Sequence, residues 1–319
     1  MIEVNNLYKS FNGFNAVKGI SFRVKKGENL ILLGTSGSGK TTTLKMINRI
    51  IKKDDGTILI NGKNTDELDH IELRRRIGYV IQNIGLFPHY TVEQNIGIVP
   101  QILKWHKNKI SERVDELLSL IGLDSELKKR KPSELSGGQQ QRVGIARALA
   151  ANPEVILLDE PFGALDPITR KEIQNEFKSL ESVLHKTMIM VTHDVKEACI
   201  LGDKICLLDN GKIQQIGTPK ELIFRPVNDF VRNFIGSNAY ELELLVITLK
   251  DLVPFLERND EYANHGDFKA QHTLQEILEN NKSAENIVFE FEGNQYVCNS
   301  ESLLGTYFSH RQQIISNLS

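Results

Sequence analysis

The chain has 319 residues, which is enough for one large domain and a smaller one, or for two domains of ordinary size. Hydrophobic residues make up 40% and charged residues 25%, and this ordinary composition excludes a chain that is disordered throughout. The net charge of −2 lacks the basic excess that is typical of nucleic-acid-binding proteins, so no nucleic-acid partner is expected. The three cysteines, Cys199, Cys206 and Cys298, lack the spacing of a disulfide scaffold or a zinc site, and we expect small buried side chains.

Neither a signal peptide nor a membrane span is predicted. The N-terminal residues lack the apolar core of a signal peptide, and no stretch reaches about 18 uncharged apolar residues. The longest apolar stretch, residues 242–253, is interrupted by Glu243, Lys250 and Asp251. We therefore expect a soluble chain, whose role at a membrane would require a partner protein.

Short apolar runs alternate with longer amphipathic ones over much of the chain, a pattern typical of α/β proteins. Strands are predicted at residues 20–24, 29–33, 79–82, 155–159, 187–192 and 204–209. Consecutive apolar residues in the fourth of these indicate a strand buried on both faces, as in a parallel sheet. The Asn61-Gly62 and Asn210-Gly211 pairs predict hairpin turns. Over residues 91–151 the spacing becomes helical, which predicts a helical insertion in a mostly parallel α/β core.

A glycine-rich loop with the pattern G-x-x-x-x-G-K-[ST] follows the second predicted strand and precedes a helical run. It comprises Gly34, Thr35, Ser36, Gly37, Ser38, Gly39, Lys40, Thr41 and Thr42. Glycines let the backbone curl so that its N–H groups face a phosphate chain, and the N-terminus of the following helix adds partial positive charge. Lys40 is expected to reach the β- and γ-phosphates, and Thr41 to offer its hydroxyl to Mg²⁺. The strand before it and the helix after it favour a phosphate-binding loop over a merely flexible one.

Two adjacent acids, Asp159 and Glu160, end the buried strand at residues 155–159, at the edge where open α/β sheets bind ligands. Asp159 is expected to hold Mg²⁺, directly or through water. Glu160 is expected to point the other way and to accept a proton from an attacking water. Alone, such a pair would indicate a solvated turn; with a phosphate-binding loop in the same chain, it predicts an ATPase.

A second turn that precedes a helix lies at residues 135–142, with the sequence Leu-Ser-Gly-Gly-Gln-Gln-Gln-Arg. By itself it is either a second anion-binding turn or an N-cap formed by Ser136. As a string it resembles the signature motif of ATP-binding cassette (ABC) ATPases, whose nucleotide-binding domains form head-to-tail dimers. In that family each signature closes on the γ-phosphate held by the other domain, which assigns Ser136, Gly137, Gly138 and Gln139 to nucleotide binding.

The remaining motifs of that family occur in order along residues 1–236. The resemblance implies that Gln82 senses Mg²⁺ and the γ-phosphate, and that His193 is the switch histidine that contacts the γ-phosphate. Asp166 matches the D-loop that crosses the dimer interface. Phe11 matches the aromatic residue that stacks on adenine, with Tyr8 as the competing candidate. The implied fold is a P-loop NTPase of the ABC type, with an antiparallel β subdomain and a helical insertion, working as a homodimer.

Three stretches resemble more narrowly the ATP-binding subunits of osmoprotectant importers, which take up glycine betaine, carnitine, choline and related quaternary amines. They are residues 45–49, 74–95 and 162–170. The resemblance implies hydrolysis of ATP with Mg²⁺ at the cytoplasmic face of a bacterial-type membrane, beside an integral-membrane permease with a substrate-binding domain. The apolar Leu86, Phe87 and Tyr90 form a proline-containing loop that either receives this permease or packs locally. Three alternatives remain: an importer of ergothioneine or another small solute, a soluble non-transport ATPase, and a cassette that binds ATP only as a regulatory switch.

The C-terminal part of the chain differs in charge. Residues 237–319 hold 13 acidic and 5 basic residues, a net charge of −8, whereas residues 1–236 carry +6. Together with the short run of small and polar residues at 236–238, this change in charge predicts a domain boundary near residues 236–240. In the C-terminal 83 residues we expect a helix over residues 273–278 and a hairpin around residues 292–294, and hence a small α+β region. It is either a truncated or degenerate form of the regulatory CBS pair that many relatives carry, or a packing or dimerising appendage.

Overall fold

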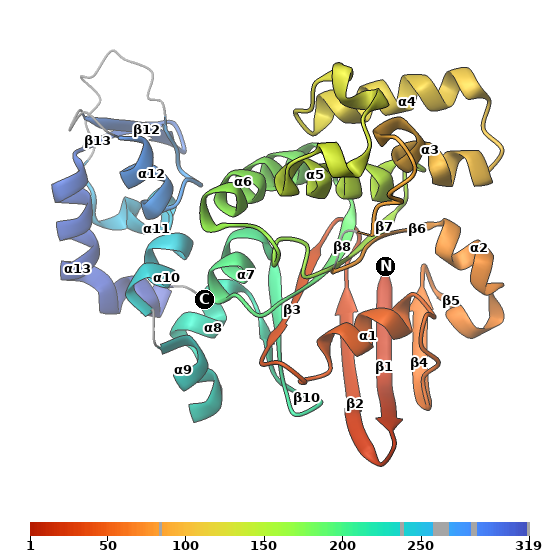
Figure 1. Ribbon diagram of the computed structural model, residues 1–319. Coiled ribbons are helices and arrows are strands. Elements are labelled where there is room, and N and C mark those ends of the chain that lie inside the picture. The colour runs from red at the N-terminus through yellow and green to blue at the C-terminus, as the bar shows by residue number, and fades with distance from the viewer. Residues whose placement is uncertain (83–84, 237–238, 258–267, 282–285, 318–319) are drawn as a thin grey trace. The chain divides into compact units, whose positions relative to one another are not determined.

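The computed structural model describes residues 1–82, 85–236, 239–257, 268–281 and 286–317, apart from the side chains of residues 181–183 (Figure 1). By its internal contacts the chain divides into two compact units, Met1–Ile216 and Gly217–Ser319. This division lies well before the boundary predicted near residues 236–240. The reason is packing, because helix α8 (Pro219–Phe224) lies on α10 (Ala239–Val246) and adds Phe224 to the apolar cluster of the C-terminal unit. The change in charge and the change in packing therefore occur at different places.

The larger sheet of the N-terminal unit has six strands in the order β10-β9-β3-β8-β7-β6. These strands are β3 (Asn29–Gly34), β6 (Ile77–Val80), β7 (Val155–Asp159), β8 (Thr187–Thr192), β9 (Lys204–Asp209) and β10 (Lys212–Gly217). β3 pairs in parallel with β8 and β9, and β7 pairs in parallel with β6 and β8. Every residue of β3, β7 and β8 is buried, which explains their nearly uninterrupted apolar runs. The predicted parallel α/β core is confirmed.

A second, antiparallel sheet has the order β2-β1-β4-β5. Its strands are β1 (Ile2–Phe11), β2 (Phe14–Val24), β4 (Asp55–Ile60) and β5 (Lys63–Asn64). The expected turn at Asn61-Gly62 joins β4 to β5, with φ of 52° and 75° at its two residues. β1 was not among the predicted strands, because Asn5 and Asn6 interrupt its apolar alternation. Asn6 has a φ of 46° at the point where the register between β1 and β2 shifts.

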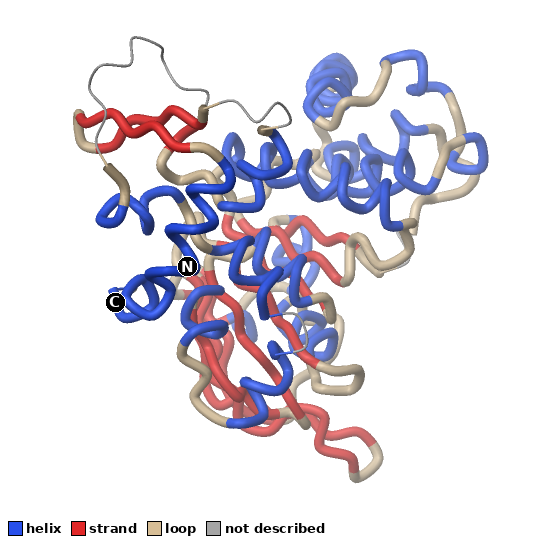
Figure 2. Tube along the Cα trace, turned by 90° about the vertical axis from the view of Figure 1, so that its left-hand side faces the viewer, coloured by secondary structure: helices blue, strands red, loops and turns tan. Residues whose placement is uncertain are grey.

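Figure 2 shows the strands of the N-terminal unit (red) gathered together, with helices (blue) packed against them. The helices are α1 (Lys40–Ile47), α2 (His70–Arg75), α3 (Val92–Ile102), α4 (Lys107–Leu120), α5 (Gly137–Leu149), α6 (Pro167–Leu184) and α7 (Val195–Leu201). Three 3₁₀ turns accompany them, η1 (Thr65–Glu67), η2 (Ser125–Lys129) and η3 (Pro132–Glu134). Helices α3, α4 and α5 pack on one another and form the predicted helical insertion (Figure 1). On α4, Val114, Leu117 and Leu118 are buried, as their helical spacing predicts.

One apolar cluster joins the two sheets and α1. It contains Val4 and Leu7 of β1, Leu30 and Leu32 of β3, and Leu44 of α1, all with no exposed surface. Burial of apolar area stabilises a fold by roughly 25 cal/mol per Å², so this cluster contributes to the stability of the unit. The turn from β3 into α1 is therefore held by apolar packing on both sides.

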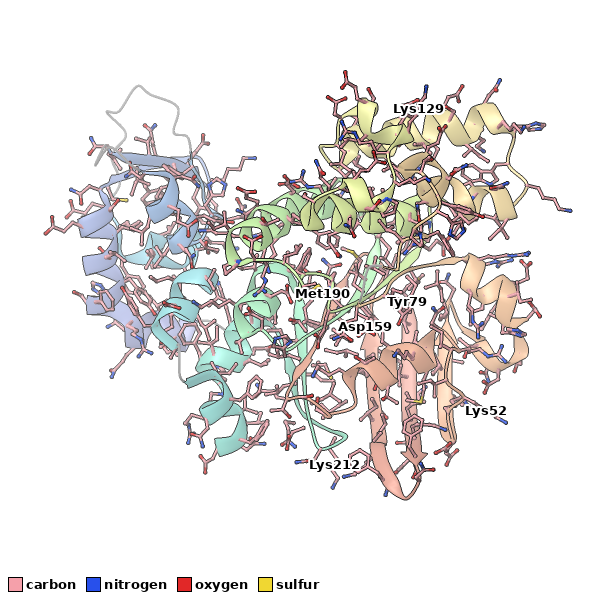
Figure 3. All side chains as sticks on the ribbon, viewed as in Figure 1. Lys52, Tyr79, Lys129, Asp159, Met190 and Lys212 are labelled. Carbon is pink, nitrogen blue, oxygen red and sulfur yellow. The ribbon has the colours of Figure 1, made fainter. Side chains whose placement is uncertain are left out.

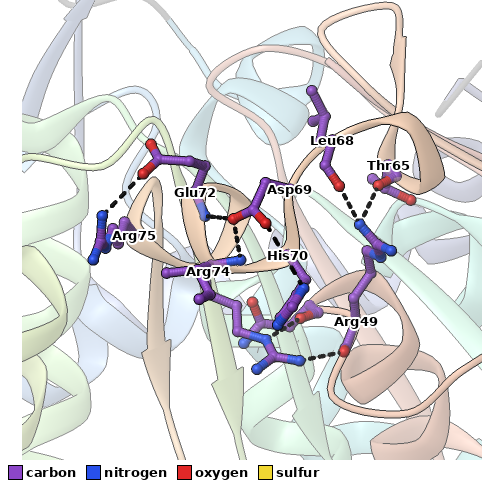
Figure 4. A network of polar contacts seen from close by, with 10 residues as sticks. Arg49, Thr65, Leu68, Asp69, His70, Glu72, Arg74 and Arg75 are labelled. Atoms are coloured by element: carbon purple, nitrogen blue, oxygen red, sulfur yellow. Dashed lines mark hydrogen bonds and ion pairs between the residues drawn. The ribbon is translucent and has the colours of Figure 1, made fainter.

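Polar contacts fasten α2 to the segment that follows α1 (Figure 4). Arg49 donates from Nη1 to the carbonyl oxygens of Thr65 and Leu68, and Arg74 donates from Nη2 to the carbonyl oxygen of Arg49. Asp69 caps α2 by accepting hydrogen bonds from two backbone N–H groups at its start. These bonds satisfy backbone groups that would otherwise end without partners, so the arginines here serve the fold.

The C-terminal unit combines short helices with a small sheet of order β11-β12-β13. Besides α8 and α10 its elements are α9 (Asp229–Gly236), α11 (Leu249–Leu252), η4 (Val253–Phe255), β11 (Phe268–Lys269), α12 (Leu274–Asn280), β12 (Ile287–Phe291), β13 (Asn294–Cys298) and α13 (Ser300–Asn317). The expected helix is confirmed as α12, with Thr273 as its N-cap. The expected hairpin is confirmed too, since Glu292 and Gly293, with φ of 50° and 77°, join β12 to the antiparallel β13. The unit has an apolar cluster of its own.

Candidate functional site

The glycine-rich loop passes from β3 into α1 in a conformation that requires glycine at two positions. Gly34 has a φ of 151°, and a Cβ there would lie 2.1 Å from the carbonyl oxygen of Leu208. Gly39 has a φ of 99°, and a Cβ there would lie 2.5 Å from the carbonyl oxygen of Ala16. No side chain fits at either place, so the loop keeps its curl and α1 begins at Lys40. This is the shape that presents backbone N–H groups to a phosphate.

Lys40 lies folded over this loop. Only 6% of the residue is exposed, and its Nζ donates to the carbonyl oxygens of Gly34 and Thr35 at 2.8 and 2.7 Å. Burial lowers the pKa of the Lys40 ammonium, while the nearby charges of Glu160 and Asp159 raise it. A phosphate group that enters the loop would take the place of the two carbonyl oxygens, so the cation is already where the ligand needs it.

Thr41 and Asp159 meet at the carboxyl end of the large sheet. Thr41 Oγ1 donates to Asp159 Oδ1 at 2.7 Å, and Asp159 is 2% exposed at the end of β7. Burial raises the pKa of the Asp159 carboxyl, and the bond from Thr41 opposes this rise. Tyr79, on the neighbouring β6, lies beside Asp159 (Figure 3), and burial together with that carboxylate raises the pKa of its phenol. A hydroxyl oxygen this close to a carboxylate oxygen is a donor set that fits Mg²⁺.

The backbone turns sharply after β7. Glu160 has a φ of 46°, and its N–H donates to the carbonyl oxygen of Val191 at 3.0 Å, so its side chain leaves the strand in a new direction. Gln82 Nε2 donates to Glu160 Oε2 at 3.1 Å, and His193 Nδ1 lies 3.5 Å from Glu160 Oε1. Three predicted site residues are thus brought together. The predicted strand end at Gln82 is wrong, because the pairing of β6 with β7 stops at Val80 and leaves Gln82 in the connection that follows.

Gln82, Glu160 and His193 line a pocket of about 670 Å³ together with the phosphate loop. Its lining consists of Phe11, Phe14, Ala16, Ser36, Gly37, Ser38, Gly39, Lys40, Thr41, Thr42, Gln82, Glu160 and His193. Phe11 belongs to this lining and the competing Tyr8 does not. Phe14 was missed by sequence reasoning and lies opposite Phe11 across the β1–β2 turn. The Asn12-Gly13 pair between the two phenylalanines was the signal for it, because a two-residue turn places its flanking residues opposite each other.

The other predicted nucleotide contacts do not line this pocket. Residues 136–139 form the start of α5, with the side chain of Ser136 as its N-cap. Asp166 precedes α6, and its hydrogen bond from Thr169 lowers the pKa of its carboxyl. A Cβ on Gly138 would lie 2.7 Å from Thr169 Cγ2, so α5 and α6 pack closely at their starts. Each chain therefore carries its phosphate loop and its signature at two separate places.

The loop predicted to meet a partner is held by one buried side chain. Asn95 of α3 has no exposed surface; it accepts from the N–H of Phe87 at 2.8 Å and donates to the carbonyl oxygens of Phe87, Tyr90 and Thr91. Phe87 remains 42% exposed, although its ring lies 5.3 Å from that of Tyr90. The loop thus has a fixed backbone and an exposed aromatic ring, and sequence reasoning missed Asn95 because no motif marks it.

The three cysteines are buried, as expected. Burial raises the pKa of the Cys199 thiol to about 12 and that of the Cys298 thiol to about 11, which leaves both protonated at neutral pH. No helix in the described part of the chain combines the length and the apolar character that crossing a bilayer would demand.

Comparison with known proteins places this site in a family. A family model described as "ABC transporter" matches residues 17–163, which include the phosphate loop, the signature and the two acids Asp159 and Glu160. The glycine betaine uptake system ATP-binding protein YehX of Escherichia coli (strain K12) is 47% identical over 278 residues, covering 87% of this chain and 89% of that protein. The glycine betaine/carnitine/choline transport ATP-binding protein OpuCA of Bacillus subtilis (strain 168) is 55% identical over 234 residues, covering 73% of this chain and 61% of that protein.

A solved structure agrees with both relatives. The ATP-binding cassette MJ0796, in a dimeric post-hydrolysis state with ADP and Pi, superposes with a TM-score of 0.62 and 36% sequence identity. The match covers 68% of this chain and 98% of that one. The expected fold, an ABC-type P-loop domain with an antiparallel β subdomain, a helical insertion and a small C-terminal α+β region, is confirmed. This chain belongs to the ABC transporter family and is an ATP-binding, ATP-hydrolysing subunit of that family.

Proposed function

We propose that this chain is the ATPase subunit of an importer for quaternary amines such as glycine betaine, carnitine and choline. It would work at the cytoplasmic face of a cell membrane, bound to a permease. The observation that carries the ATPase part is the meeting of Gln82, Glu160 and His193 beside the phosphate loop. The cargo is proposed from the relatives, because the Escherichia coli protein is named for glycine betaine uptake and the Bacillus subtilis protein for glycine betaine, carnitine and choline transport.

ATP binding follows from the geometry of the pocket. The phosphates would accept hydrogen bonds from the loop N–H groups and from Lys40. Thr41, Asp159 and the amide oxygen of Gln82 would hold Mg²⁺, which when bound neutralises charge on the β- and γ-phosphates. The exposed ring of Phe11, with Phe14 opposite it, would stack on adenine at the open end of the pocket.

Hydrolysis depends on how Glu160 is held. Its two carboxylate oxygens contact different partners, Gln82 on one side and His193 on the other. These two contacts fix the orientation of the side chain. We propose that it accepts the proton of the attacking water, a role that typically contributes 10²- to 10⁴-fold to a rate. His193, whose side chain is 63% exposed, would turn toward the γ-phosphate from the opposite side of that carboxylate.

A second copy of the chain completes the site. The signature at residues 136–139 does not line the pocket that contains the phosphate loop, and each chain has one of each. We propose a head-to-tail dimer in which Ser136, Gly137, Gly138 and Gln139 contact the ATP held by the partner. In support, the matched cassette MJ0796 is dimeric. Asp166 would lie at the interface between the copies.

The permease is proposed to meet the loop that carries Phe87. An exposed aromatic ring on a backbone fixed by Asn95 is suited to contact with another protein, because little ordering is needed when it binds. In this proposal ATP occupies the pocket, whose lining consists of the phosphate loop, two phenylalanines and the side chains around Glu160. Recognition of the cargo would therefore belong to the permease and its binding domain.

The test is purification of the tagged chain from native membranes in a mild detergent, followed by reconstitution of the complex in liposomes. We expect a co-purifying permease and ATP hydrolysis that rises when glycine betaine, carnitine or choline is present. If ergothioneine alone stimulates ATP hydrolysis, ergothioneine and not one of these three compounds is the cargo. Recovery only from the soluble fraction would overturn the transport role, and a purified wild-type protein without basal ATP hydrolysis would overturn the ATPase role.

A further inference from the structure

One buried carboxylate near the pocket has no part in the hydrolysis described above. Glu197, in the first turn of α7, is 5% exposed and accepts a hydrogen bond from Gln174 Nε2 of α6 at 2.9 Å. Burial, together with the charge of Asp194, raises the pKa of the Glu197 carboxyl above its ordinary value, and the Thr192 hydroxyl, the Gln174 amide and the charge of Arg170 only oppose this rise. Because burying a carboxylate is costly, its retention at this place calls for a specific role.

On one side Glu197 faces the arginine that fixes the segment before α6. Arg170 donates from Nε to the carbonyl oxygen of Phe162 at 3.2 Å and from Nη2 to the carbonyl oxygen of Leu165 at 2.8 Å. Arg170 and Glu197 line the same small cavity, and the charge of Arg170 acts on the carboxylate. The guanidinium thus holds the backbone that leads into Asp166 and lies across this small cavity from Glu197.

The same part of α6 supports the signature. A Cβ on Gly138 would lie 2.7 Å from Thr169 Cγ2 and 3.2 Å from Ile173 Cδ1, so the start of α5 rests on the first two turns of α6. Further along the two helices, Arg142 Nη2 and Glu176 Oε1 form an ion pair at 2.7 Å. The start of α6 therefore contacts both elements that are proposed to face the nucleotide of the partner.

On its other side Glu197 is bonded to the short turn that carries His193, which lies directly before α7. Asp194 caps α7, and its Oδ1 accepts from the N–H groups of Lys196 and Glu197 at 2.8 and 3.2 Å. The N–H of Asp194 donates in turn to Thr192 Oγ1 at 3.1 Å. His193 is thus carried on a short turn that is tied at both ends, and Glu197 is the point at which this turn is bonded to α6.

We infer that Glu197 is a positioning residue for ATP hydrolysis, which makes the start of α6 and the turn of His193 move as one body. This inference rests on the proposed head-to-tail dimer. The start of α6 carries the side of the chain that meets the partner's ATP, and the turn of His193 meets the chain's own ATP. With Glu197 between them, closure of the signature on one nucleotide aligns His193 and Glu160 on the other.

The test compares four full-length proteins: the wild type, Glu197→Gln, the swap variant Glu197→Gln/Gln174→Glu, and Glu172→Gln as a control. The swap keeps one carboxylate and one amide between the helices, and keeps the carboxylate one turn from Arg170 on α6. Glu172 lies exposed on the same helix, so its variant controls for loss of one acidic charge. For each protein the measurements are kcat and KM for Mg²⁺-ATP, affinity for a fluorescent ATP analogue, and the melting temperature.

We expect Glu197→Gln to lower kcat about tenfold with KM and analogue affinity unchanged, and the swap variant to recover most of that loss. Glu172→Gln should match the wild type. Two results would overturn the inference: a wild-type kcat for Glu197→Gln, or a folded swap variant with kcat as low as that of the single variant. If Glu197→Gln does not fold, the swap variant is compared with the wild type alone: a kcat close to that of the wild type supports the inference, and a kcat about tenfold lower overturns it. An inactive wild type would instead refute the proposed ATPase function, so the two failures are distinguishable.

Discussion

Lys40 shows how a single residue prepares the pocket for a phosphate. Burial lowers the pKa of its ammonium, the charges of Glu160 and Asp159 raise it, and two loop carbonyl oxygens accept its hydrogen bonds. An isolated buried charge is strongly unfavourable. The position therefore suits a residue whose ammonium binds an anionic ligand. The motif predicted the residue, whereas its folded-over position could not be predicted, since it depends on the curl imposed by Gly34 and Gly39.

Replacing Lys40 by alanine should weaken ATP binding by roughly 10- to 100-fold, the effect of losing a hydrogen bond to a charged group. The change is measured by titration with a fluorescent ATP analogue, with Lys52→Ala, at an exposed position after α1, as the control. Unchanged affinity in Lys40→Ala would show that the phosphates bind elsewhere.

At the scale of elements, the parallel strands and the start of α1 were predictable because buried strands and a phosphate loop have patterns of their own. The strand β1 was not, since its bulge at Asn6 breaks the alternation of apolar residues. The signature could be recognised as a string, but its distance from the phosphate loop within one chain is set by tertiary packing. The bond between Gln174 and Glu197 was also beyond reach, because two single polar residues on different helices form no pattern.

A second inter-helix bond, in the C-terminal unit, makes the stability of that unit depend on pH. Glu243 of α10 is 4% exposed and accepts hydrogen bonds from Tyr307 and Arg311 of α13. Burial raises the pKa of the Glu243 carboxyl, but the bonds from Arg311 and Tyr307 outweigh this effect, so its pKa in the folded state lies below that of an ordinary glutamate. The stabilisation is therefore complete above the pKa of an unfolded glutamate, about 4.3, and is lost as the pH falls through the folded-state pKa.

We predict that Glu243→Gln destabilises the C-terminal unit by roughly 1.5 kcal/mol at pH 7, since it removes the charged acceptor of the bonds from Tyr307 and Arg311. The loss stays modest because the Arg311 side chain is 42% exposed and remains hydrated. The difference from the wild type should shrink as the pH falls below the ordinary pKa of a glutamate, about 4.3. Calorimetric unfolding of both proteins between neutral and acidic pH measures it, with the exposed Glu301→Gln as the control. Parallel curves for wild type and Glu243→Gln would contradict the role of this ion pair.

At the scale of the whole molecule, the chain consists of two units with separate apolar clusters. The residues proposed for ATP lie in Met1–Ile216, and α8 packs with the C-terminal unit although it precedes the change in charge. Charge and motif content predict a second unit that begins near residues 236–240, whereas the internal contacts divide the chain after Ile216. The packing of Phe224 on residues distant in sequence leaves no local signal for this earlier division. The regulatory or packing role of this unit stays a prediction.

Two truncations test whether the second unit begins after Ile216, where the internal contacts divide the chain, or near residue 236, where the charge changes. A chain that ends at Ile216 should fold, bind ATP and keep a melting temperature close to that of the wild-type N-terminal transition. A chain that ends at Gly236 should be less soluble, because α8 would lose α10 and the apolar cluster against which its Phe224 packs. Comparison of soluble yield and thermal unfolding tests this, and the reverse ranking would place the boundary near residue 236.

The most direct test of the central claim is uptake of radiolabelled glycine betaine by cells whose own copy of this protein has been replaced by Glu160→Gln. The substitution keeps the size of the side chain and removes the group that accepts the proton from water. We predict that the variant still binds ATP, accumulates as an ATP-bound dimer, and lowers uptake at least 100-fold relative to the wild type. Uptake equal to that of the wild type would show that hydrolysis at Glu160 does not drive the transport of this cargo.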